Sequence, residues 1–136
     1  MERFRSLMAK VPTGLLSCVT VALILWLTLA PHPTGDLEIP LFPGADKVVH
    51  AIMFGFLTLV VLLESMKHRR WGAIPLPAVG AIAIACALFG LGIELLQHAM
   101  GLGRSFEVLD ILADTGGAIA MGALWAMFQY LLVKRD

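Results

Sequence analysis

Four long apolar stretches constrain the fold of this chain more than any other feature. They lie at about 15–30, 48–63, 73–96 and 108–133. A helix needs about 20 apolar residues to cross the hydrocarbon core of a bilayer. The third and fourth stretches reach that length alone, and the first two reach it with their flanks. Only 15% of the residues are charged, against about a quarter in a soluble domain, which indicates a membrane protein.

The pattern predicts an all-α polytopic membrane protein with a single domain over residues 1–136. We expect a compact bundle of four transmembrane helices, at about 13–30, 47–65, 73–99 and 108–133. Segment 31–46 is rich in Pro and Gly, which exclude a regular helix, so it is predicted to be an outer loop. It is interpreted either as a plain connector or as a lid over nearby polar residues. Ser105 and Glu107 are expected to cap the last helix.

The basic residues predict the orientation. Eight of them fall at the two termini and in the turn near 67–70: Arg3, Arg5, Lys10, Lys67, Arg69, Arg70, Lys134 and Arg135. Cytoplasmic segments of membrane proteins carry such an excess, so both termini are predicted to be cytoplasmic. Glu64, just before this turn, is interpreted as a surface residue that pairs with His68.

The start of the chain also fits a second reading. Basic residues, a short apolar run and Ala30 loosely match a cleaved signal peptide. Pro31 would hinder cleavage at that point, so we expect the first helix to be retained. No stretch resembles a nucleic-acid-binding surface, and nucleic acid is not predicted as a partner.

A set of polar residues falls at the outer ends of the predicted helices. Its members are Asp46, Lys47, His50, Glu94, Gln97, Arg104, Asp110 and Asp114. Within each helix they are spaced three or four residues apart, so they share one face. Ionisable groups in a membrane cost about 2.5–3.5 kcal/mol each on insertion scales and usually mark a functional site. Asp110 alone also fits an early-turn acid favoured by the helix dipole, and Arg104 alone fits a loop charge.

This mixture of acids, bases and cations predicts the roles of its members. We assign acid–base chemistry to His50, Glu94, Asp110 and Asp114, and ligand contact to Asp46, Lys47, Gln97 and Arg104. Four neighbouring carboxylates would not all stay ionised, because burial and like charges disfavour the charged form. The site is therefore expected to hold a proton, a divalent cation or a cationic ligand. No metal motif of fixed spacing is present, so no metal ligand and no cofactor is assigned, although a divalent cation stays open.

The ordered motifs resemble the VanZ-like family. They are Asp46-Lys47-x-x-His50-x-x-x-Phe54, Glu94-x-x-Gln97, Gly103-Arg104-Ser105, and Asp110-x-x-x-Asp114 with Gly117. The resemblance implies a small bacterial multi-helix membrane protein of the cell envelope, in a family named after a protein associated with low-level teicoplanin resistance. The chain differs from the family pattern at two positions. Asp114 stands where Asn is common, and Ile93 stands where an acidic or small polar residue is common.

We therefore expect a protein of the bacterial cytoplasmic membrane with its polar residues on the periplasmic side. They are predicted to bind a lipid headgroup, a lipid-linked cell-wall intermediate or a glycopeptide, with a link to teicoplanin resistance. The alternative is an enzyme performing acid–base chemistry on a lipid-linked or phospholipid substrate. Proton-coupled transport is less expected, because the inner halves of the helices are apolar. Small residues spaced i, i+4 in the last helix favour tight packing within the chain and leave a homodimer open.

Overall fold

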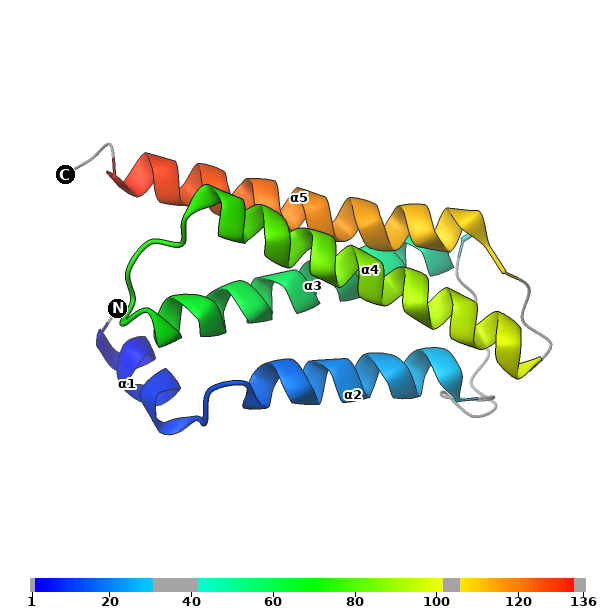
Figure 1. The fold of residues 1–136 in the computed structure, drawn as a ribbon, viewed down its shortest axis with the longest axis horizontal. Helices are drawn as coiled ribbons and strands as arrows, with labels where there is room; N and C mark the ends of the chain where they lie inside the picture. Colours follow the sequence, from blue (N-terminus) through cyan, green and yellow to red (C-terminus); the bar gives the residue numbers. More distant parts are fainter. Residues whose placement is uncertain (1, 31–41, 102–105, 134–136) are drawn as a thin grey trace.

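The computed structural model describes residues 2–30, 42–101 and 106–133, and these ranges contain helices and connecting turns but no strand. The helices are α1 (Glu2–Lys10), α2 (Leu15–Leu29), α3 (Ala45–His68), α4 (Leu76–Met100) and α5 (Val108–Val133). They lie roughly lengthwise beside one another, apart from the short α1 at one end (Figure 1). The all-helical prediction is confirmed, with one helix more than expected.

Three helices are long and apolar enough to cross a membrane by themselves: α3, α4 and α5. The stretch that forms α3 looked marginal in the sequence, yet the helix extends over 24 residues because its polar flanks are helical too. A fourth span exists only if α1 and α2 count as one, and these two helices meet at a bend of 73°. The described residues thus contain three candidate membrane spans, or four if the bent pair forms one span.

Helix α1 was not expected, and the residues after it explain why it stops. Pro12 lacks an N–H group for the helix ladder, and Gly14 has a φ of +88°, a left-handed conformation that side-chain-bearing residues rarely adopt. Helix α1 contacts the turn before α4. The Phe4 ring lies 6.0 Å from the Trp71 ring, and the Arg5 guanidinium lies 5.6 Å from the same ring.

Glu64 is not the exposed surface residue that the sequence suggested. It is 4% exposed, because its carboxylate faces the start of α2 and accepts three backbone N–H groups. These come from Gly14 at 3.0 Å, Leu16 at 3.2 Å and Ser17 at 3.2 Å. The first N–H groups of a helix have no partner within the helix, so a carboxylate from α3 supplies the cap that α2 lacks.

Helix α5 packs most extensively against α3 and next against α4. Gly117 of α5 lies so close to α3 that a Cβ at this position would overlap the Ala51 carbonyl group, while Gly122 faces Ala83 of α4. Small residues of α5 thus allow close contact with both α3 and α4, because helix backbones approach each other closely only where side chains are short or missing. One core between the helices is formed by Ile24, Phe54, Leu57, Cys86, Ile93 and Ala118.

Polar residues and basic residues lie at opposite ends of the helices. The start of α3, the end of α4 and the start of α5 meet at one end, and α1 lies at the other (Figure 1). Apart from Lys47, the Lys and Arg residues in the described ranges belong to α1, to the last turn of α3 or to the α3–α4 turn. Large apolar side chains such as Leu88 (60% exposed) and Phe128 (56% exposed) face outward between the two ends, as lipid-facing residues do.

Candidate functional site

Three helix ends bring together the acidic residues, His50 and Lys47. We call this set the polar cluster: Asp46, Lys47 and His50 from α3, Glu94 from α4, and Glu107, Asp110 and Asp114 from the start of α5 and the residue before it. Asp46 and Asp110 lie in the first turns of α3 and α5. The positive end of a helix dipole favours an anion there, so the helix directions help to hold these acids.

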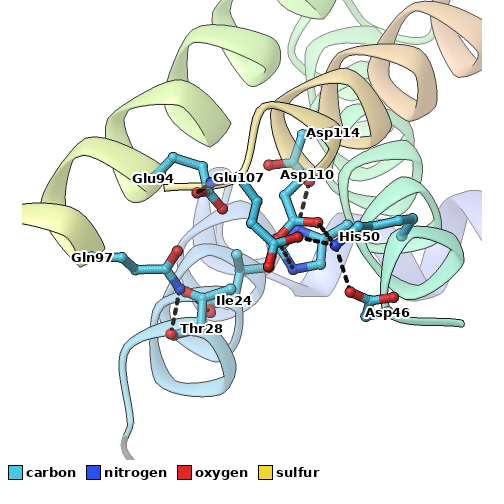
Figure 2. A network of polar contacts seen from close by, with 10 residues as sticks. Ile24, Thr28, Asp46, His50, Glu94, Gln97, Glu107, Asp110 and Asp114 are labelled. Carbon is cyan, nitrogen blue, oxygen red and sulfur yellow. Dashed lines mark hydrogen bonds and ion pairs between the residues drawn. The ribbon is translucent and has the colours of Figure 1, made fainter. Parts of the chain in front are cut away.

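His50 and Asp114 form the most deeply buried pair of the cluster (Figure 2). His50 Nδ1 lies 2.9 Å from Asp114 Oδ1, and the Asp114 side chain is 1% exposed. Gly90 of α4 makes room for this carboxylate, since a Cβ there would lie 2.7 Å from Asp114 Oδ2. Asp114 as acceptor fixes the proton of the neutral imidazole on Nδ1 and leaves Nε2 free to act as a base or a ligand.

Lys47 holds the outer part of the cluster together. Its Nζ lies 2.6 Å from Asp46 and 2.7 Å from Asp110 Oδ1, and it also pairs with Glu107. One ammonium group is therefore shared among three carboxylates. Because these pairs already use its charge, Lys47 contacts acids of the chain rather than presenting a free cation.

The Glu94 carboxylate is buried, and only one of its two oxygens accepts a hydrogen bond from the described residues. The side chain is 1% exposed. Oε2 accepts the backbone N–H of Glu107 at 3.3 Å, which ties the end of α4 to the start of α5. Oε1 is buried and has no hydrogen-bond partner among the described residues. A buried polar atom without a partner is uncommon and calls for an explanation.

Gln97 and Arg104 complete the set predicted from the sequence. Gln97 is buried and donates from Nε2 to the Thr28 backbone oxygen at 2.7 Å, so it joins α4 to the end of α2. In Figure 2 Gln97 and Thr28 lie to one side of His50. Arg104, expected to contact a ligand, lies outside the described residues, as do Ser105 and segment 31–41 of the loop.

Glu107 is the member of the cluster for which the sequence predicted only a capping role. Its carboxylate pairs with Lys47, 60 positions earlier in the chain. The spacing contained a hint, because Glu107 and Asp110 are three residues apart and such positions neighbour each other on a helix. Their common partner on another helix depends on how α3 and α5 pack.

Two groups in the cluster have the ligand atoms that a metal ion uses. His50, Glu94 and Asp110 each offer one atom within 4.8 Å of the others, and so do Asp46, Glu107 and Asp110. In total, five carboxylates face one ammonium group and one imidazole. The described cluster is therefore acidic, and it favours ligands that bring positive charge.

A protein-family model described as VanZ/LLP1 matches residues 17–129, which include the whole polar cluster. No curated protein and no solved structure matches the chain. The match covers most of the chain and agrees with the resemblance inferred from the motifs.

Proposed function

The chain belongs to the VanZ/LLP1 family, and from this premise we propose that it is a multi-pass protein of the bacterial cytoplasmic membrane whose polar cluster binds the charged headgroup of a membrane lipid or lipid-linked cell-wall intermediate. The observation that carries the proposal is the collection of five carboxylates, Lys47 and His50 at one end of membrane-spanning helices. Polar groups at such positions are retained for function far more often than for stability.

The depth of the cluster supports a headgroup ligand. Asp114 is six residues after the first residue of α5, which is about 9 Å along the helix at about 1.5 Å per residue. Asp46 and Lys47 follow the first residue of α3 directly. The cluster thus extends from the helix ends into the outer part of the span, where lipid headgroups and the first carbons of their chains lie.

Charge indicates which part of the headgroup meets the cluster. The described polar cluster bears more carboxylates than cations, and Lys47 is already shared by three of these carboxylates. A ligand that contacts these acids has to bring positive charge, either as an ammonium group or as a cation that accompanies a phosphate. A glycopeptide with an amine offers the same chemistry, which is how we propose a link to teicoplanin resistance.

The periplasmic side is proposed from the basic residues at the opposite end. Arg3, Arg5 and Lys10 on α1 and the basic turn after α3 are typical of a cytoplasmic face. The polar cluster would then face the cell wall, where lipid-linked intermediates are exposed.

Catalysis is the second candidate, and the His50–Asp114 pair is the observation that favours it. An imidazole oriented by a buried carboxylate at 2.9 Å has the arrangement of a general base. Its substrate would be the same lipid headgroup. Transport is not favoured, because His50 is followed one and two turns later on α3 by the fully buried, apolar Phe54 and Leu57.

Native mass spectrometry of the protein extracted gently from its own membrane tests the proposal. We compare wild type, Glu94→Gln, and Glu2→Gln as a control at an exposed position on α1. A specific lipid retained by wild type and the control but lost from Glu94→Gln is the expected result. Identical bulk lipids in all three proteins would contradict headgroup binding.

Two further arms separate the ligand sources and the second candidate. Teicoplanin is added to the purified protein, and binding that depends on Glu94 assigns the site to the glycopeptide instead of a lipid. The retained lipid is also incubated with fresh protein. Recovery of unchanged lipid supports binding alone, whereas a new product that Glu94→Gln does not form supports an enzyme.

A further inference from the structure

The unpartnered oxygen of Glu94 indicates a ligand deep in the cluster. Oε1 is buried without a hydrogen-bond partner among the described residues, on a side chain that is 1% exposed. An ionised carboxylate taken out of water needs a compensating charge or hydrogen bond. Among the described residues the Glu107 N–H group satisfies only Oε2, so Oε1 is open to a group that binds there.

His50 directs its second ring nitrogen to the same place. Nδ1 is held by Asp114 at 2.9 Å, while Nε2 lies 4.0 Å from Asp110 Oδ2. That separation is too long for a hydrogen bond, and it suits two ligands of one central ion. A carboxylate that holds one nitrogen of an imidazole and frees the other is the usual support of a metal-binding histidine.

Asp110 directs its two oxygens to two different side chains. Oδ1 lies 2.7 Å from Lys47 Nζ, and Oδ2 faces His50. The outer acidic group of Asp46, Glu107 and Asp110 also has ligand atoms within 4.8 Å of one another. Lys47 pairs with all three, however, so its ammonium group supplies the positive charge there. In the inner group of His50, Glu94 and Asp110, Lys47 pairs only with Asp110, and no Lys or Arg among the described residues pairs with Glu94.

We propose that His50, Glu94 and Asp110 bind one divalent cation of the Zn²⁺ or Mn²⁺ class, with Asp114 positioning the imidazole. One nitrogen and two carboxylate oxygens form a mixed donor set that suits these ions. Three protein ligands leave a coordination position open for water or for a phosphate oxygen. The inference rests on the proposed function for its role, since the cation would supply the positive charge through which the acidic cluster meets a lipid phosphate.

Zinc binding by the full chain tests the site directly. Protein purified in detergent is stripped with a chelator and dialysed against Zn²⁺ in excess Mg²⁺, and bound zinc is counted by atomic emission. We expect one Zn²⁺ per chain, at least about 100-fold weaker binding in Glu94→Gln and Asp110→Asn, and nearly unchanged binding in Glu2→Gln, a control at an exposed position on α1 outside the polar cluster. X-ray absorption at the zinc edge of wild type, which needs no variant, should show one imidazole nitrogen among oxygen ligands.

The outcomes separate this inference from the proposed function. Absence of stoichiometric zinc, a zinc edge without an imidazole ligand, or equal binding by Glu94→Gln and wild type would overturn it. A stripped protein that binds no zinc but retains its specific lipid would leave headgroup binding intact. Stoichiometric zinc bound through His50 without any retained headgroup or glycopeptide would instead support the metal site and overturn the headgroup proposal.

Discussion

Glu64 on α3 and Ser17 on α2 form a double hydrogen bond that fixes the start of α2. Glu64 Oε2 accepts the Ser17 hydroxyl at 2.5 Å and the Ser17 backbone N–H at 3.2 Å. Oε1 accepts the N–H groups of Gly14 and Leu16. One carboxylate thus accepts four hydrogen bonds. They cap the first turn of α2, which follows the 73° bend between α1 and α2.

Removing the charge of this cap should destabilise α2. Glu64→Gln keeps the side-chain shape but replaces one carboxylate oxygen with an NH₂ group, which cannot accept the backbone N–H groups of α2. We therefore expect the free energy of unfolding to fall by about 1–2 kcal/mol, as for the loss of a helix N-cap. Ser17→Ala removes only the hydroxyl bond and should cost about 1 kcal/mol. Thermal unfolding in detergent measures both, with Glu2→Gln as the control. Equal melting temperatures for Glu64→Gln and the control would contradict a stabilising cap.

The contact of Gly117 with α3 should be necessary for assembling the cluster. A Cβ at Gly117 would overlap the Ala51 carbonyl oxygen, so Gly117→Ala has to push α3 and α5 apart. We expect a loss of at least about 1–3 kcal/mol from overpacking, together with loss of ligand binding. The neighbouring Gly116 has open space around its Cβ position, and Gly116→Ala should be neutral or slightly stabilising. Melting temperatures of the two variants make the comparison, and similar values would contradict this packing.

The sequence predicted the general position of the site, because membrane depth makes polar residues conspicuous. Asp46, His50, Glu94 and Asp110 fall near the ends of apolar helices, and short connections force those ends together. The sequence could not predict which residues of the site would pair with each other. His50 meets Asp114 only because Gly117 lets α5 approach α3 closely, and no local pattern states which helix faces will meet.

The two misread features share one physical cause. Glu64 has its hydrogen-bond partners 47 to 50 positions earlier in the chain, so its neighbour His68 gave a misleading local explanation. Helix α1 has only nine residues, too few for a reliable helical pattern. Its Phe4 and Arg5 side chains contact Trp71, which lies in a turn far from α1 in the sequence. Such features depend on packing between segments that are far apart in sequence.

Substitution of Gly90 on α4 should disturb the polar cluster through Asp114. A Cβ there would lie 2.7 Å from Asp114 Oδ2 and 2.9 Å from Asp114 Cβ, so Gly90→Ala should displace Asp114 and release His50. We expect lipid retention and zinc affinity to fall by about 10–100-fold, as when a carboxylate behind a ligating histidine is lost. Gly92, two residues further along α4, has open space around its Cβ position. Gly92→Ala is therefore the matched control, and parallel losses in both variants would show that α4 tolerates no added methyl group.

Replacement of Asp114 distinguishes its geometry from its charge. In Asp114→Asn the amide oxygen can still accept the Nδ1–H of His50, so the imidazole stays oriented while one negative charge is lost. We expect zinc affinity and lipid retention to fall by no more than about tenfold, about 1.4 kcal/mol.

Asp114→Leu keeps the number and branching of the side-chain heavy atoms but has no acceptor, so the imidazole loses its orientation and a larger loss, of about 10–100-fold, should follow. Equilibrium dialysis and native mass spectrometry of the two variants beside wild type measure the difference. If Asp114→Asn is as impaired as Asp114→Leu, the charge of Asp114 acts on the ligand directly. The role of Asp114 as the residue that positions His50 would then be wrong. If both variants match wild type, Asp114 is not needed to orient the His50 imidazole. The contact between His50 Nδ1 and Asp114 Oδ1 would then contribute only to packing between α3 and α5.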